Sequence, residues 1–120
     1  MEVVLDIIEP REGIVFITGY VVQAGKVGDD LTTLNILQPA KKQKQAPKRL
    51  SSGDVSLTVA NIIVKGEPYD SIDADHIAQI GLTGGAEPLL ALLKDHHWHE
   101  RNGRYLLPRN ETRIITLSGG

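Results

Sequence analysis

Residues 13–30, with the sequence GIVFITGYVVQAGKVGDD, decide the expected fold of this chain. Positions 14–22 are rich in β-branched and aromatic side chains, a composition that favours a strand over a helix. Two glycines and two aspartates follow within positions 25–30, and these residue types favour a turn. The stretch therefore predicts a strand that runs into a turn, with Gly19 marking a bulge or a sharp bend inside the strand.

The rest of the chain repeats this pattern of short apolar segments between turns. Such segments predict further strands at residues 3–8, 31–37, 55–65, 75–82, 97–101, 104–107 and 112–117. Leucines spaced three and four positions apart predict one helix over residues 86–94, with Pro88 in its first turn. The dipeptide Asn102–Gly103 predicts a hairpin turn, because both residues tolerate a positive φ.

These elements predict a mostly β protein of one domain, as suits a chain of 120 residues. We expect a small antiparallel β-barrel over residues 1–85, with residues 86–120 forming a helix and β-hairpin extension packed on it as one structural unit. Residues 39–53 are polar and contain two prolines, so they are expected to form a long loop. Residues 66–73 are expected to form a further turn region.

The order and spacing of these segments resembles domain II, the β-barrel domain of translational GTPases such as elongation factor Tu. The positions that match the signature of that domain are Gly13, Thr18, Gly19, Val21, Gly25, Val27, Gly28 and Asp29. Residues 55–65 and 69–84 are similar to its later strands, although Asp75 stands where the family usually has glycine. The resemblance covers about residues 3–84 and implies the barrel alone, because a fold does not fix a function.

The matching residues have expected physical roles in such a barrel. Gly19 would allow a neighbouring backbone to approach closely. Gly25 and Gly28 would supply the positive φ angles of the connecting turn. The Asp29 side chain would bond its own downstream backbone, and aspartate at position 75 tolerates the left-handed region better than most residues.

Composition excludes several classes of protein. The chain has no cysteine, which excludes a disulfide scaffold, a cysteine-ligated zinc site and a thiol nucleophile. It lacks the phosphate-loop motif Gly-x-x-x-x-Gly-Lys-Ser/Thr, so no bound nucleotide is expected. The first residues lack the basic region of a signal peptide, and no segment approaches the roughly 20 apolar residues of a membrane span. We therefore expect a cytoplasmic protein without a membrane partner.

The concentrated positive charge of the chain lies in residues 39–49. Its basic side chains are those of Lys41, Lys42, Lys44, Lys48 and Arg49. The chain as a whole carries a net charge of −2, so this segment has the opposite sign and would steer an anionic partner toward itself. No aromatic residue is interleaved for base stacking. The segment is the candidate binding site, and a merely solvated loop is the alternative interpretation.

Two other polar groups are candidate sites. His96, His97 and His99 could ligate a metal, since His97 and His99 would share a face of a strand; the alternative is an exposed polar segment. The three aspartates between residues 70 and 75 lack the glycine and terminal glutamate of a calcium-binding loop. They indicate turn and capping chemistry instead.

The sequence therefore predicts a non-catalytic binding or interaction module, with no catalytic residue and no cofactor. Its partner is unknown and is expected to be a protein or RNA. A metal-dependent enzyme or metal-binding protein using the cluster His96–His99 is the first alternative. A conjugated modifier is the second, because the sequence given ends in Gly119 and Gly120.

Overall fold

The chain folds mostly into antiparallel strands. The computed structural model describes residues 1–38, 48–95, 98–107 and 113–119. The elements in chain order are β1 (Glu2–Arg11), β2 (Ile14–Gln23), β3 (Gly25–Lys26), β4 (Asp30–Gln38), β5 (Lys48–Val64), β6 (Glu67–Tyr69), β7 (Ser71–Ile72), β8 (His76–Gly85), α1 (Glu87–Asp95), β9 (His99–Arg101), β10 (Arg104–Leu106) and β11 (Ile114–Ser118). The prediction of a mostly β fold with one short helix is confirmed.

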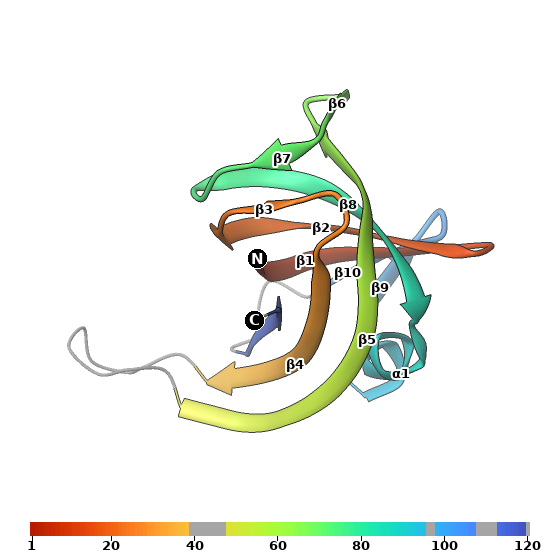
Figure 1. The fold of residues 1–120 in the computed structure, drawn as a ribbon. Helices are drawn as coiled ribbons and strands as arrows, with labels where there is room; N and C mark the ends of the chain where they lie inside the picture. Colours follow the sequence, from red (N-terminus) through yellow and green to blue (C-terminus); the bar gives the residue numbers. More distant parts are fainter. Residues whose placement is uncertain (39–47, 96–97, 108–112, 120) are drawn as a thin grey trace.

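Six of these strands close into a barrel (Figure 1). Their order is β1-β2-β8-β5-β4-β11, and β11 returns to pair with β1. Every neighbouring pair is antiparallel. Closure pairs β11 with β1 and so removes most of the exposed edges that would otherwise recruit further strands, but residues 48–54 of β5 extend beyond the end of β8.

Apolar side chains fill the interior of the barrel. They alternate with exposed or half-buried residues along the strands, as in Val15, Ile17 and Val21 of β2. The largest fully buried side chains are Ile8, Ile17, Leu31, Leu57, Ile62, Ile80, Leu82, Leu89, Ile115 and Leu117. Burial of each contributes about 1.5–3 kcal/mol relative to exposure, so this cluster is the main stabilising element of the fold.

The last strand belongs to the barrel itself. Leu117 of β11 lies opposite Val3 of β1 on one side and Leu34 of β4 on the other. The expected division, with the barrel complete by residue 85, is therefore wrong for residues 114–118. The sequence shows that β11 follows the helix and the hairpin along the chain, but its position in space depends on pairing with strands that are distant in the sequence.

Gly19 of β2 lies where a neighbouring backbone approaches closely, as predicted. A Cβ atom there would collide with the backbone carbonyl of Val4 on β1. The pairing of β1 with β2 also shifts register between Leu5 and Ile7, next to the partner of Gly19. Only glycine permits this close approach of the two strands.

The turn after β2 differs in detail from the expectation. Gly28 has a positive φ of 99°, as expected, but Gly25 lies in β3 against the side chain of Met1 and is not among the residues with positive φ. The Asp29 carboxylate accepts a hydrogen bond from the upstream amide of Lys26, at 3.0 Å, rather than from downstream backbone. The Asp29 side chain therefore bonds to the end of β3 and not to the strand that follows the turn.

The longest strand, β5, curves around the barrel (Figure 1). Its register shifts twice against β4 and once against β8, and each shift leaves one extra residue on β5. Such bulges bend a strand and increase its twist. Residues 48–53 pair with β4 and belong to this strand, so the expected loop over residues 39–53 is wrong for them; residues 39–47 lie outside the described residues.

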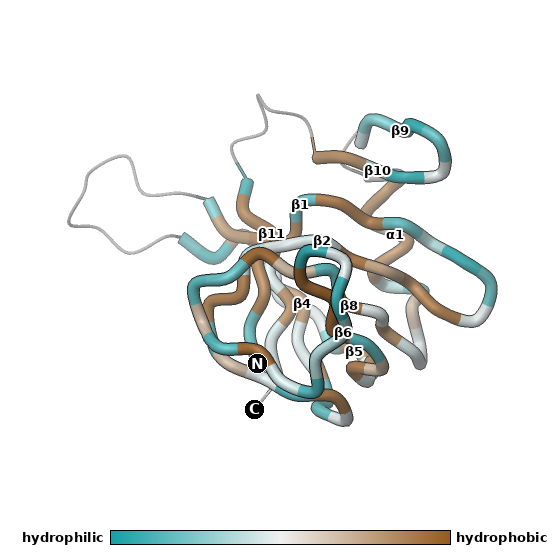
Figure 2. The backbone as a smooth tube through the Cα atoms, turned by 90° about the horizontal axis from the view of Figure 1, so that it is seen from above, coloured by the Kyte–Doolittle hydropathy of each residue, from teal (hydrophilic) through white to brown (hydrophobic). Residues whose placement is uncertain are grey.

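Helix α1 and the β9–β10 hairpin lie away from the two termini (Figure 2). Leu89 and Leu92 of α1 are buried in the same cluster as the barrel interior. The hairpin turns at Asn102 and Gly103, with φ angles of 55° and 80°, as predicted. Nine residues long, α1 is the single helix of the described segments, and it falls short of what a membrane crossing requires.

Charged side chains tie the hairpin to β1. The Glu9 carboxylate accepts hydrogen bonds from Arg11 at 2.6 Å and from Arg104 of β10 at 3.1 Å. Burial raises the pKa of Glu9, but the two guanidinium groups outweigh it and hold that pKa below its ordinary value. Arg11 also lies 4.7 Å from the centre of the Phe16 ring. This cluster joins β10 to β1 beside the positions where the two strands pair.

Candidate functional site

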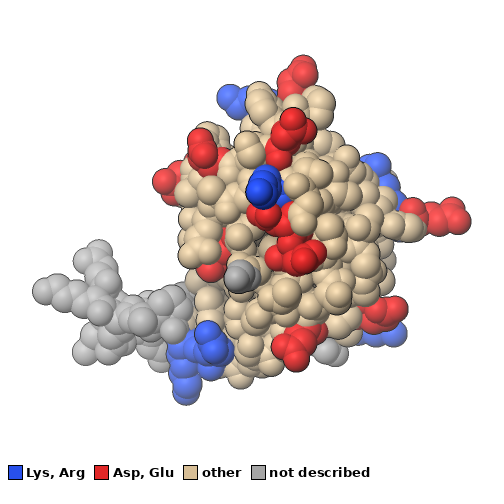
Figure 3. Space-filling view, viewed as in Figure 1, with Lys and Arg blue, Asp and Glu red and all other residues tan. Residues whose placement is uncertain are grey.

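The predicted binding residues fall in part on the start of β5. Lys48 and Arg49 are its first two residues, and both are exposed. Lys41, Lys42 and Lys44 lie outside the described residues. Figure 3 shows the blue side chains of this region at the lower left, where β5 begins in Figure 1. The structure therefore brings two of the five predicted residues together, on a paired strand.

Residues 48–54 of β5, which we call the basic arm, pair with a neighbour along one edge. That neighbour is β4, whose Gln38 and Leu37 lie opposite Lys48 and Arg49. On the other edge β8 ends with Gly85, opposite Ser56. In the described ranges no strand pairs with that edge of the basic arm, so it presents backbone donors and acceptors of the kind that an added strand would use.

An apolar side chain accompanies the charges of the basic arm. Leu50 is 45% exposed and is the extra residue of the bulge between Arg49 and Ser51. Arg113, also exposed, directly precedes β11, whose Ile114 pairs with Leu37 of β4, so it lies beyond β4 and not at the unpaired edge; the groups beside that edge are those of the arm itself. Cationic and apolar groups thus lie beside an open strand edge.

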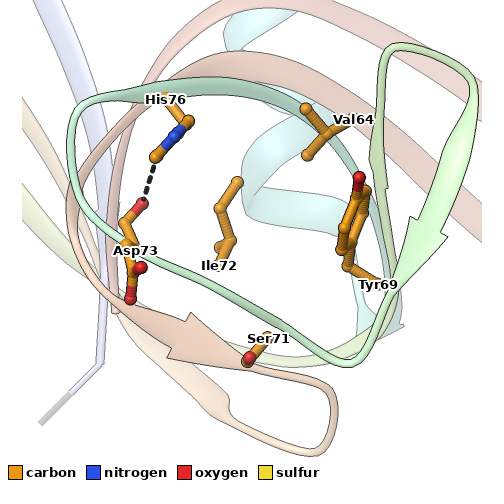
Figure 4. Close-up of a pocket in the computed structure, with 6 residues that line it drawn as sticks. All are labelled: Val64, Tyr69, Ser71, Ile72, Asp73 and His76. Carbon is orange, nitrogen blue, oxygen red and sulfur yellow. Dashed lines mark hydrogen bonds between the residues drawn. The ribbon is translucent and has the colours of Figure 1, made fainter.

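A second candidate lies at the other end of β5, where a pocket of about 220 Å³ opens between the end of β5 and the start of β8 (Figure 4). We call it the rim pocket; its lining residues are Val64, Tyr69, Ser71, Ile72, Asp73 and His76. Tyr69 and Val64 stand on one side, His76 stands on the opposite side, and Ile72 lies between them. An aromatic ring and an imidazole thus flank an apolar floor.

Local turns position these walls. Lys65 and Gly66 have φ angles of 52° and 82° and form a two-residue turn between β5 and β6, because Val64 pairs directly with Glu67. This hairpin brings Tyr69 to the rim of the barrel, opposite Ile62. Paired φ angles above zero match the twist of the strands that such a turn connects.

The floor of the rim pocket is anchored to the barrel. Ile72 is 7% exposed and belongs to the core cluster. It pairs with Gly25 of β3, so the short β3–β7 ribbon fixes its position. The chain then enters β8 through Asp75, whose φ is 68° and whose amide donates to the Val21 carbonyl at 2.8 Å. Aspartate thus adopts the left-handed conformation at this turn, as expected for position 75.

Hydrogen bonds hold the imidazole wall. Nδ1 of His76 lies 3.3 Å from the carbonyl oxygen of Asp73 and 3.1 Å from that of Ala74. Since both neighbours are acceptors, Nδ1 is the donor in these contacts, which leaves Nε2 as the acceptor whenever the ring is neutral. The Tyr20 hydroxyl donates to the Asp75 carboxylate, and this bond raises the pKa of Tyr20 above its ordinary value.

The rim pocket is set in acidic surroundings. Residues 64–76 contain Glu67, Asp70, Asp73 and Asp75 against the single cation of Lys65. Figure 3 shows carboxylates gathered over the region of β3 and β7. Sequence reasoning assigned these aspartates to turns and missed the pocket. The pair Lys65–Gly66 directly after the apolar run of residues 62–64 was the available hairpin signal, while the pairing of β3 with β7 spans too few residues to leave a pattern.

The other predicted candidates remain apart from these two regions. His99 is exposed on β9, opposite Leu106, while His96 and His97 lie outside the described residues. Among the residues that the structure places, no three histidine, aspartate or glutamate side chains form a group that could hold a metal. The amide of Gly119 donates to the Met1 carbonyl at 3.0 Å, and Gly120 lies outside the described part.

Comparisons of the chain with protein-family models, with curated proteins and with solved structures found no match.

Proposed function

We propose that this protein is a non-catalytic binding module that holds an acidic, extended segment of a partner protein along the basic arm. The proposal rests on the unpaired edge of residues 48–54. These residues pair with β4 along their other edge only, and all of them are exposed. A peptide can add to such an edge through main-chain hydrogen bonds, while side chains supply the specificity.

Charge selects the kind of partner. Lys48 and Arg49 are exposed at the start of the arm, and Lys41, Lys42 and Lys44 precede them in the sequence. Carboxylates would be steered to this end of a chain that is otherwise net acidic. The exposed Leu50 favours a peptide with apolar residues between its carboxylates. The described arm offers no aromatic ring on which a nucleic acid base could stack.

The test uses a capped ten-residue peptide that alternates glutamate with valine, and a single-stranded RNA of matched length, each titrated against the whole chain. We expect the peptide to bind at low salt and to weaken as salt is added, because exposed charges are screened. Replacing four lysines by glutamine should lower its affinity at least fivefold; the four are Lys41, Lys42, Lys44 and Lys48.

A matched control removes the same charge elsewhere, by changing to glutamine the four residues Lys26, Lys65, Lys94 and Arg101. This control should bind the peptide as the parent does. Equal loss in both variants would mean that net charge, rather than the basic arm, attracts the peptide. The partner would instead be RNA if the parent binds the RNA with a steep salt dependence and only the first variant loses that binding.

A further inference from the structure

We propose that the rim pocket binds the guanidinium group of an arginine side chain, supplied by a basic segment of a protein. This site is separate from the basic arm and takes a ligand of the opposite charge. Its lining combines an aromatic ring, an apolar floor and hydrogen-bond acceptors. Each of these three features corresponds to one part of an arginine side chain.

The aromatic wall suits a planar cation. Tyr69 is 51% exposed, and its ring lines the pocket on the side opposite His76. A guanidinium stacks on the face of such a ring through the attraction between a cation and the ring electrons. Val64 and Ile72 provide apolar surface for the three methylene groups that precede the guanidinium.

The opposite wall supplies acceptors. In a neutral ring Nε2 of His76 is the acceptor nitrogen, because Nδ1 faces the carbonyl oxygens of Asp73 and Ala74. Asp73 and Ser71 also line the pocket and add oxygen acceptors. A guanidinium has five N–H donors and no acceptor, so it can satisfy several of these groups at once.

Charge and size exclude competing ligands. Four carboxylates and one lysine in residues 64–76 disfavour a phosphate-bearing ligand such as a nucleotide. A volume of about 220 Å³ is at the small end for ligand pockets, which suits one side chain rather than a whole cofactor. Lysine would satisfy the charge, but it lacks the flat group that stacks on Tyr69.

The experiment follows backbone amide resonances of the whole chain by NMR while a capped arginine amide is added. The comparison probes are capped citrulline amide, which has nearly the same shape without the charge, and capped lysine amide. A capped Gly-Gly-Arg-Gly-Gly peptide separates a peptide source from a small guanidinium source, represented by ethylguanidinium. We expect shifts confined to residues 64–76, with a dissociation constant on the order of 1 mM for one side chain.

Citrulline should bind at least tenfold more weakly than arginine, and lysine should lie between them. Tyr69→Leu keeps an apolar side chain but removes the ring, and should weaken arginine binding at least fivefold. Asp73→Asn should weaken it at least threefold. The matched control Glu12→Gln removes an exposed carboxylate in the turn between β1 and β2, and should change nothing.

Resonances of the core report whether each variant is folded, and Asp70→Asn serves as the second charge variant if Asp73→Asn unfolds. The proposal is overturned if citrulline binds as well as arginine, or if the Tyr69 variant binds like the parent. Stronger binding of ethylguanidinium than of the peptide would overturn the peptide as the source. The variant in which Lys41, Lys42, Lys44 and Lys48 are replaced by glutamine should retain arginine binding, so failure of one proposal is distinguishable from failure of the other.

Discussion

The two ends of β5 differ in how the chain builds them. At its start, the basic arm is a strand with one open edge, and its side chains are exposed. At its end, Val64 joins a hollow whose floor, Ile72, is buried and whose imidazole wall is hydrogen bonded. The first end presents an open backbone edge and charges, while the second forms a pocket with a buried floor. Substitutions in the pocket floor should therefore lower stability, whereas substitutions in the basic arm should affect binding alone.

The largest effect is expected at the floor of the rim pocket. Ile72→Ala removes apolar atoms from a residue that is 7% exposed, and should lower the free energy of unfolding by about 2–4 kcal/mol. Denaturant unfolding measures this loss. Ile77→Ala, at a neighbouring position that is 68% exposed, is the matched control and should change stability by less than about 0.5 kcal/mol. Equal losses would show that Ile72 does not anchor the pocket.

A smaller effect is expected at the turn into β8. Asp75 has a φ of 68°, a conformation that a β-branched residue adopts with difficulty, so Asp75→Val should destabilise by about 1–2 kcal/mol. Asp75→Gly removes the same carboxylate but accepts this φ freely, and should cost less. Thermal unfolding of the two variants checks the order. If glycine costs as much as valine, the carboxylate matters at this position and the backbone angle does not.

The hydrogen bond from Tyr20 to Asp75 gives a pH-dependent signal. Because this bond raises the pKa of Tyr20, its contribution to stability is present below the ordinary tyrosine pKa of about 10 and is lost as the pH rises through the raised value. Ultraviolet absorbance of the phenolate should show a late-titrating tyrosine, which Asp75→Asn moves to lower pH. An unchanged titration in that variant would contradict the assigned bond.

The smallest effect on stability is expected in the basic arm. Lys48→Gln and Arg49→Gln together should change the free energy of unfolding by less than about 0.5 kcal/mol, since both side chains are exposed. The same two substitutions should lower the affinity for the acidic peptide. Denaturant unfolding and peptide titration are measured on aliquots of one protein preparation. A loss above 1 kcal/mol would mean that the arm supports the barrel, and binding changes could then not be assigned to charge.

Strand positions could be predicted because their apolar alternation is local. The strand in residues 14–23, the helix from Glu87 and the turn at Asn102–Gly103 all follow from spacing and residue type. The place of β11 could not be predicted, because it depends on pairing with β1 and β4, which both lie in the first third of the chain. Residues 48–53 lack alternation since both of their faces are exposed, and β4 alone makes them a strand.

The candidate sites divide along the same line. The charges of Lys48 and Arg49 are visible in the sequence, whereas the edge that presents them depends on where β8 ends. The rim pocket depends on Tyr69, Ile72 and His76 from three elements, which meet through the β5–β6 turn and the β3–β7 ribbon. Its shape follows from tertiary pairing that residue types alone do not specify.

A double titration shows directly whether β5 carries two separate surfaces of opposite charge at its two ends. The capped arginine peptide and the acidic peptide are titrated into the same isotope-labelled sample, first singly and then together, while backbone amide resonances are followed. We expect shifts in residues 64–76 with the arginine peptide and in residues 48–54 with the acidic peptide. Each affinity should be unchanged by the other ligand once direct association of the two peptides is subtracted. Overlapping shifts, or shifts outside both regions, would contradict this arrangement of two surfaces.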